Sequence, residues 1–404
     1  MVGGAASAQE WDMNIGGFFT GDIMFSESSG NFLNAATDFD GAVINTNAEI
    51  LFRPSITLDN GMTFGAVVEL EGNTSGDQID ESYMYVESDS MGRVELGSEN
   101  SVGYKMMTGA PSVGFGIASP SNSAFLPISP TLLSGGQALV RNAYGNTSTE
   151  VAGNNDAQRI SYYTPSFNGL SLGVSYAPGT AQGNGQTDRN GGVSDIFDIA
   201  ANYSQSFGNV DMTLSARWGT GDAGTAFNVV NNGIDGVAGT GDDILAPSLV
   251  QQDDPETWGI GAQFGFGAFT VGAAYAENDA GNVIPVTVGG NTVGFADGAG
   301  DSEGYHVGVT YALDNAWTVG ADMYQGEIDL GTTTTGFSSK SEYNAFQIGA
   351  SRSLGSGVTW RIYAIQAEVN RSTNNPAGFG AGTVPVLKQK VESTTIGTGI
   401  ALTF

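Results

Sequence analysis

Apolar and polar residues alternate with a period of two along most of the chain, and helical periodicity is scarce. In the segment LSLGVSYAP, Leu170, Leu172 and Val174 share one face, whereas Ser171 and Ser175 share the other. The segments VDMTLSARWG, WGIGAQFGFG and YHVGVTYAL repeat the pattern. Strict alternation of this kind predicts β-strands that have one apolar and one polar face.

Sixteen segments carry this alternation, and we expect each of them to form one strand. The predicted strands are residues 11–25, 42–58, 62–72, 81–88, 91–98, 157–165, 169–177, 195–207, 209–218, 256–266, 268–276, 303–313, 315–325, 341–354, 357–369 and 391–404. Short turns rich in Asn, Asp, Gly and Ser join some neighbours, as hairpins require. Between them lie the long connections 26–41, 73–80, 99–156, 178–194, 219–255, 277–302, 326–340 and 370–390. Short turns at one end and long loops at the other are typical of an outer-membrane barrel.

Aromatic residues crowd the predicted strand ends, which favours a membrane protein over a soluble β-sandwich or β-solenoid. Those at the long-loop end are Tyr176, Trp218, Trp258, Tyr275 and Tyr305, and those at the short-turn end are Phe207, Phe266, Phe269, Trp317 and Trp360. Two such belts mark the two interfaces of a bilayer. The polar faces are too hydrophilic to pack into a dry interior. We therefore predict an all-β, sixteen-stranded antiparallel transmembrane barrel around an aqueous channel.

Composition excludes several classes of protein. A net charge of −29 with only 13 Lys and Arg argues against a nucleic-acid partner. The absence of Cys excludes disulfides, thiolate metal sites and Cys nucleophiles. The single histidine, His306, is the only candidate for a Ser–His site, and its parity points it toward the polar face. No apolar stretch is long enough for a transmembrane helix. We expect no enzymatic activity and no required cofactor.

The first residues, MVGGAASAQEWDM, contain the small-residue triplet Ala6-Ser7-Ala8. This triplet fits the rule for signal-peptidase cleavage and would leave Gln9 at the start of the mature chain. We interpret residues 1–8 as the remnant of a signal peptide and residues 9–404 as a single barrel domain. A flexible tail of small residues is the alternative.

Two motifs connect the chain with a known family: GRVELGSEN at residues 92–100, before a long third loop, and the terminal IALTF. With the strand layout, they make the chain resemble the general porins of Gram-negative bacteria, of the α-proteobacterial type. The resemblance implies a homotrimer in the outer membrane, in contact with lipid and lipopolysaccharide, through which small hydrophilic solutes diffuse passively. It implies that the third loop, residues 99–156, folds inward and narrows the pore. It also implies that the barrel-assembly machinery recognises Phe404.

Charged residues at lumen parity are the candidate pore-lining residues. Arg53, for example, lies in a strand in which Ile50 and Phe52 face outward. A charge on the lipid face at the bilayer midplane costs roughly 2–4 kcal/mol, which favours the lumen. The predicted constriction residues are Arg53, Arg93, Arg159, Arg217, Arg361, Glu69, Glu95 and Glu99. Opposed charges in a narrow pore set ion preference. Solvated wall residues without a role in selectivity are the alternative.

The acidic excess is concentrated in one part of the chain. From Trp218 to Ser339 there is no Lys or Arg against sixteen Asp and Glu, and most of these lie in two long loops. Asp235, Asp242 and Asp243 lie among glycines there, and carboxylates of this kind suit Ca²⁺. The spacing differs from that of an EF-hand, and a solvated surface loop is the alternative. A negative vestibule concentrates cations, so we predict a mild cation preference.

Two other functions stay open from the sequence. A substrate-selective channel would have the same architecture with a third loop adapted to one class of solute. An inward-facing row of aromatic residues would favour it, and no clear row is evident in the sequence. A surface structural protein anchored by its barrel is the second alternative. Apart from residues 99–156, however, no connection exceeds 40 residues, so the loops offer little room for a domain.

Overall fold

The computed structural model describes residues 10–31, 39–72, 78–118, 150–183, 185–231, 244–288, 291–297, 300–332, 338–374 and 386–404. The strands are β1 (Asp12–Ser29), β2 (Gly41–Thr57), β3 (Thr63–Glu71), β4 (Ile79–Ser88), β5 (Gly92–Ser98), β6 (Gln158–Tyr163), β7 (Leu170–Gly179), β8 (Ser194–Phe207), β9 (Val210–Asp222), β10 (Thr225–Asn231), β11 (Ile244–Gln251), β12 (Glu256–Phe266), β13 (Phe269–Asp279), β14 (Val283–Val288), β15 (Asn291–Asp297), β16 (Ser302–Ala312), β17 (Trp317–Thr332), β18 (Ser338–Gly355), β19 (Val358–Asn374) and β20 (Val386–Thr403). The helices are α1 (Val102–Lys105) and the 3₁₀ helix η1 (Val151–Gly153). Within these residues, neither helix is long or apolar enough to cross a membrane.

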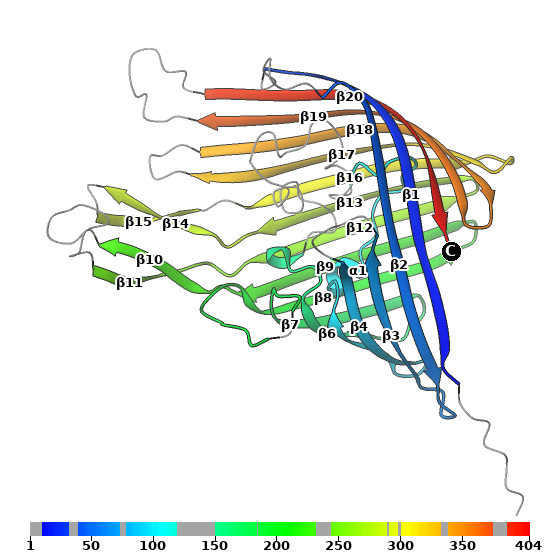
Figure 1. Ribbon diagram of the computed structural model, residues 1–404, viewed down its shortest axis with the longest axis horizontal. Helices are drawn as coiled ribbons and strands as arrows, with labels where there is room; N and C mark the ends of the chain where they lie inside the picture. Colours follow the sequence, from blue (N-terminus) through cyan, green and yellow to red (C-terminus); the bar gives the residue numbers. More distant parts are fainter. Residues whose placement is uncertain are drawn as a thin grey trace, which may run out of the picture.

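Sixteen strands form one closed antiparallel barrel in the order β1-β2-β3-β4-β5-β6-β7-β8-β9-β12-β13-β16-β17-β18-β19-β20 (Figure 1). The ring closes between β1 and β20, which pair from Phe18 opposite Thr403 to Ser29 opposite Glu392. Phe404 extends the ladder, because its carbonyl accepts from Gly17 N at 2.9 Å. Closure leaves no unpaired edge, which a bilayer requires. The predicted sixteen-stranded antiparallel barrel is confirmed.

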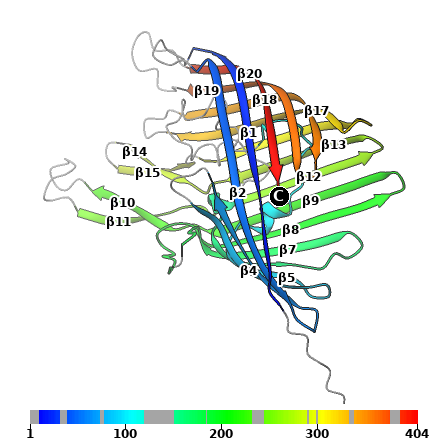
Figure 2. The ribbon, with the colours of Figure 1, turned by 45° about the vertical axis from the view of Figure 1, so that its right-hand side comes forward.

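Two further hairpins, β10–β11 and β14–β15, lie within the predicted connections 219–255 and 277–302. They project beyond the barrel strands at one end of the barrel, apart from its closed ring (Figures 1 and 2). The alternation pattern missed them because Pro247 in β11 and Pro285 in β14 break the sequence signal of a strand. Proline lacks an N–H, and a two-stranded sheet tolerates it because each strand has a free edge.

The barrel wall has the two faces that the alternation predicts. Leu172, Ile199, Ile260 and Phe346 are exposed on the outer face. Polar and charged residues face inward between them, and many of them are buried inside the barrel, including Ser175, Asp198 and Gln347. An outward row of apolar side chains is what a lipid-facing surface needs.

The first part of the third loop lies inside the barrel. Residues 99–118 leave β5 and hydrogen-bond to inward-facing side chains of β8, β9, β12, β18 and β19. These bonds are Asn202 Nδ2 to Met106 O (3.0 Å), Thr108 N to Ser215 Oγ (2.8 Å), Gln263 Nε2 to Gly109 O (2.6 Å), Phe115 N to Gln347 Oε1 (2.7 Å) and Arg361 Nη1 to Gly114 O (3.0 Å). The loop backbone thus finds its partners on the wall. Residues 119–149 lie outside the described residues, as do residues 1–8.

Wall glycines let the loop backbone lie against the strands. A Cβ on Gly261 in β12 would lie 1.9 Å from Thr108 O, and one on Gly308 in β16 would lie 2.1 Å from Pro111 O. Contacts this short cannot exist, so any larger residue at these positions would displace the loop. Glycine at these positions of the inner face therefore permits the close approach of loop and wall.

Candidate functional site

An acidic patch, formed by Glu49, Glu69, Glu71, Asp80 and Glu81, lies on the lumen side of β2, β3 and β4. Glu49 and Glu71 are direct cross-strand partners. Between β3 and β4 the register shifts, because Val68 pairs with Ser82 whereas Leu70 pairs with Ile79. Two residues, Asp80 and Glu81, thus lie opposite the single residue Glu69. A β-bulge of this kind re-aims a side chain, here that of Asp80.

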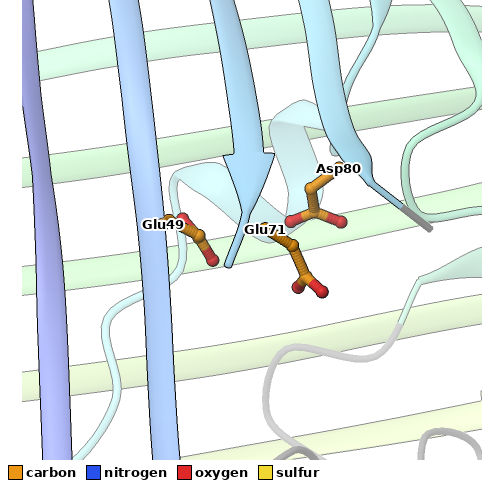
Figure 3. A group of neighbouring side chains, drawn as sticks. All are labelled: Glu49, Glu71 and Asp80. Carbon is orange, nitrogen blue, oxygen red and sulfur yellow. The ribbon is translucent and has the colours of Figure 1, made fainter. Parts of the chain in front are cut away.

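Three carboxylates of the acidic patch converge (Figure 3). Oxygen atoms of Glu49, Glu71 and Asp80 lie within 4.8 Å of one another. Within the described residues, this is the group whose carboxylates are close enough to share a cation. The acidic patch puts five carboxylates on one stretch of wall. The predicted Ca²⁺ ligands Asp235, Asp242 and Asp243 lie outside the described residues.

Lys105, at the end of α1, lies in a cage of acidic and aromatic side chains. Its Nζ donates to Glu95 Oε2 at 2.8 Å and to Glu99, and it lies 4.8 Å from the ring centre of Tyr83 and 5.7 Å from that of Tyr163. Burial favours the neutral amine, but the negative charge of Glu99 and its neighbours outweighs this and holds the pKa of Lys105 above its usual range. Burial and the adjacent Glu95 raise the pKa of Glu99 to about 8.

Arg93 continues this row of charges along the wall. Its Nε donates to Glu95 Oε1 at 2.5 Å and its Nη1 donates to Glu87 Oε2 at 2.7 Å. Its guanidinium carbon lies 3.8 Å from the ring centre of Tyr85. Glu95 therefore bridges Arg93 and Lys105. The wall residue and the loop residue are linked through one buried carboxylate.

The structure corrects the prediction for Arg159, Arg217, Glu95 and Glu99. The three strand residues face inward as their parity predicts and Glu99 begins the loop, but the four are only 2%, 4%, 2% and 0% exposed, so they do not line open water. Arg159 donates to the backbone carbonyls of Glu99 and Asn154, at 2.5 Å each, and thus ties together both ends of the third loop. Alternation fixes the face of a side chain, but not what packs on that face.

Arg159 also lies near two carboxylates. Its guanidinium nitrogens are 3.9 Å from Glu150 Oε1 and 4.0 Å from Asp198 Oδ2. Arg217 donates to Thr257 Oγ1 at 3.3 Å. The buried charges behind the loop therefore face charges of opposite sign. Their arrangement anchors the loop to the wall rather than facing a passing solute.

Arg361 and Arg53 are the other two predicted arginines. Arg361 pairs with Asp22, whose Oδ1 also accepts from Tyr363 OH at 2.9 Å, and so holds the loop at Gly114 from the opposite wall. Arg53 is exposed on β2 and interacts electrostatically with Glu69. Glu69 and Arg53 thus belong to the same part of the lumen, while Glu95 is buried between Arg93 and Lys105.

Inward-facing aromatic residues were missed from the sequence. Phe115 of the loop packs with Tyr324, Tyr343 and Tyr363 of β17, β18 and β19 in a buried cluster. The ring centres of Phe115 and Tyr363 are 5.6 Å apart. The parity of these tyrosines was readable, since each alternates with an outward neighbour. The loop covers these tyrosines, so they form a packing surface for the loop and are not exposed to a passing solute.

Residues 1–376 match the family model described as Gram-negative porin. The chain belongs to the Gram-negative porin family. This porin is an outer-membrane channel for passive diffusion, and the closed barrel with its polar interior is the structure that such a channel needs. A comparison with curated protein sequences gives no match.

Solved structures share the fold of this porin at low sequence identity. The anion-selective porin from Comamonas acidovorans is 14% identical, with 98% of this chain and 100% of that chain covered and a TM-score of 0.54. The Vibrio cholerae outer membrane protein OmpT, in a trimer form, is 12% identical over 98% and 99%, with a TM-score of 0.53. A porin refined at 1.8 Å is 17% identical over 97% and 100%, with a TM-score of 0.54. These similarities concern the fold alone.

Proposed function

We propose that this porin passes small hydrophilic solutes and ions down their gradients, with a preference for cations and without chemistry or a cofactor. The observation that carries the preference is the excess of carboxylates on one wall. On β2–β5 and at the start of the loop there are eight carboxylates. Glu95 and Glu99 are buried and paired with Arg93 and Lys105, and the other six are Glu49, Glu69, Glu71, Asp80, Glu81 and Glu87. The same stretch has three cations, Arg53, Arg93 and Lys105.

The remaining lumen arginines do not balance this excess. Arg361 is paired with Asp22, and Arg159 lies near Glu150 and Asp198. An excess of one sign in a narrow, low-dielectric passage raises the local concentration of counter-ions. The acidic patch is therefore the part of the pore that attracts cations.

The reversal potential of the reconstituted channel in a KCl gradient tests this proposal. We expect the sign that corresponds to K⁺ preference. Replacing Glu49 and Glu71 together with Gln should shift the reversal potential toward anions, because two converging charges are removed. Glu368→Gln is the matched control, since Glu368 faces outward and pairs with Lys390. Anion preference in the unmodified channel would refute the assignment.

The same recordings separate the alternatives. A diffusion pore has a current that rises linearly with solute and does not saturate, whereas a substrate-selective channel is blocked or saturated by one solute. A barrel that only anchors surface loops passes no current. Tyr83, Tyr85 and Tyr163 are half-buried in the lumen, but Lys105 or Arg93 lies over each of their rings, which argues against a free stacking surface for a sugar.

We further propose that the porin is a homotrimer. Support comes from the family and from the trimer form of the Vibrio cholerae protein, which shares the fold. Cross-linking in detergent, followed by electrophoresis with and without heating, tests the assembly. A single band at the mass of one chain under all conditions would count against it.

A further inference from the structure

Lys105 occupies the start of the third loop, directly after the wall strand β5. It is the last residue of α1 and the one basic residue between Glu99 and Ala118. Ser101 caps the helix by accepting a hydrogen bond from Tyr104 N at 3.1 Å, and its own N–H donates to Glu150 Oε1 at 2.5 Å. The helix is thus fixed at its beginning by polar contacts, and Lys105 fixes its end.

The Lys105 cage is formed mostly by the wall. Glu95 belongs to β5, Tyr83 to β4 and Tyr163 to β6, while Glu99 is the first residue of the loop. The side chains of Glu95 and Glu99 are 3% and 0% exposed, and that of Lys105 is 27% exposed. The positive charge of the Lys105 ammonium is therefore strongly compensated by the carboxyl groups of Glu95 and Glu99 and by the ring faces of Tyr83 and Tyr163. Its charge is directed at the wall rather than at the pore.

The contacts that follow along the loop are of a different kind. From Met106 to Gly109, the backbone is held by hydrogen bonds to the neutral side chains Asn202, Ser215 and Gln263. A neutral hydrogen bond contributes less than a buried ion pair whose loss leaves a charge uncompensated. Within residues 102–109, here called the limb, the strongest single link to the wall is therefore that of Lys105.

We propose that Lys105 is a positioning residue of the pore: it holds α1 against β4–β6 and thereby keeps the channel open, while contributing little to ion preference. This inference rests on the proposed function of the chain as an open diffusion pore. Removing the ammonium leaves Glu95 and Glu99 buried without their shared cation. Glu95 then holds a buried negative charge without the ammonium beside it, the Lys105 hydrogen bonds to Glu95 and Glu99 are lost, and α1 loses its contact with the wall.

Single-channel recording of the whole porin carrying Lys105→Met tests the proposal. Methionine keeps an unbranched side chain but removes the charge. We expect brief closures to become more frequent by on the order of tenfold or more, as a lost buried ion pair requires. The reversal potential should change less than in the Glu49→Gln, Glu71→Gln double variant. Lys340→Met is the control, because Lys340 is exposed on the outer face and pairs there with Glu327.

A covalent tether distinguishes position from charge. The chain has no Cys, and Thr108 Oγ1 of the loop lies 3.2 Å from Asn202 Nδ2 of the wall. Thr108→Cys with Asn202→Cys, added to Lys105→Met, can be bridged by a short bis-methanethiosulfonate reagent, because the asparagine side chain that spans this gap is longer than a cysteine. The bridge holds the limb in place without restoring the charge, and a reductant cleaves its disulfides. We expect steady currents after cross-linking and frequent closures after reduction. Where the untethered Lys105→Met chain does not insert, the tethered form before and after reduction provides the same comparison.

Two outcomes would overturn the inference. A steady current in Lys105→Met would exclude a positioning role, and a large shift in reversal potential with that steady current would identify Lys105 as a charge that acts on passing ions. Closures that persist with the cross-linked tether would show that they do not arise from displacement of this limb. Failure of the proposed function is a separate result, since the unmodified porin would then pass no current at all.

Discussion

Gly261→Ala should narrow the pore without unfolding the barrel. Gly261 faces the loop from β12, and an added Cβ would lie 1.9 Å from Thr108 O and 2.9 Å from Thr108 C. Ordinary van der Waals contact begins at 3.4 Å, so the backbone at Thr108 must move away from the wall by 3.4 − 1.9 = 1.5 Å. The wall strand is fixed by its two neighbours, so the loop is the part that moves, toward the centre of the lumen.

The displacement breaks the hydrogen bond from Thr108 N to Ser215 Oγ, which is 2.8 Å long. With the strain of overpacking, we expect a cost of about 1–3 kcal/mol. A barrel held by sixteen paired strands tolerates this loss. The expected result is a normally inserted porin whose single-channel conductance is lower than that of the unmodified protein.

Gly265→Ala on the same strand is the matched control. There the nearest atom to an added Cβ is Asp211 Cβ at 3.5 Å, which is an ordinary contact. Conductance should therefore stay unchanged in this variant. Equal conductance in both variants and the unmodified porin would refute the argument that the loop rests on Gly261.

Three further predictions follow from the site. Arg159→Met should lower the free energy of unfolding of the porin by about 3–5 kcal/mol, because Glu150 and Asp198 stay buried without the nearby cation and both ends of the loop lose their hydrogen bonds to Arg159. Denaturant unfolding in detergent measures this loss of stability. A change below about 1 kcal/mol would contradict the prediction. The pKa of Glu99 is raised from 4.5 to about 8, so its protonated form is favoured in the folded state; this stabilisation is complete below pH 4.5 and is lost as the pH rises through about 8. Stability in the unmodified porin should therefore fall between pH 5 and pH 8 more than in Glu99→Gln, and parallel profiles would exclude Glu99 as the cause. Deletion of Phe404 should reduce insertion into membranes far more than the conductance of the channels that do insert, because Phe404 pairs with Gly17 at the closure and lies outside the lumen; normal insertion in quantitative membrane fractionation would refute this.

The barrel could be predicted from the sequence because alternation of apolar and polar residues is a local pattern within each strand. A side chain in a strand faces one side or the other by parity alone, so the inward placement of Arg53 and Arg93 and the pairing of β1 with β20 could be predicted. The same parity gives the inward direction of Tyr343 and Tyr363. What parity cannot give is burial, because burial depends on a segment that lies far away in the sequence and packs on the same face.

Two features of the site illustrate this limit. Arg159 and Arg217 were expected to line the pore, yet both are buried, and Arg159 anchors the loop through the carbonyls of Glu99 and Asn154. Asp80 would face outward by simple alternation from Met84, and only the bulge opposite Glu69 turns it toward Glu49 and Glu71. A bulge adds one residue to one strand and depends on the partner strand, so a single segment does not reveal it.

The position of the loop in the lumen therefore depends on residues of the barrel wall as much as on residues of the loop itself. A loop that enters a lumen must satisfy its backbone polar groups, and here Ser215, Gln263 and Gln347 supply partners from three strands. Glycines give the backbone room to reach those partners, and the Lys105 cage fixes where the loop begins. None of these wall groups has to touch a solute to influence its passage. Substitutions on the wall beneath the loop should consequently alter conductance through the loop's position, whereas substitutions in the acidic patch should alter ion preference through charge.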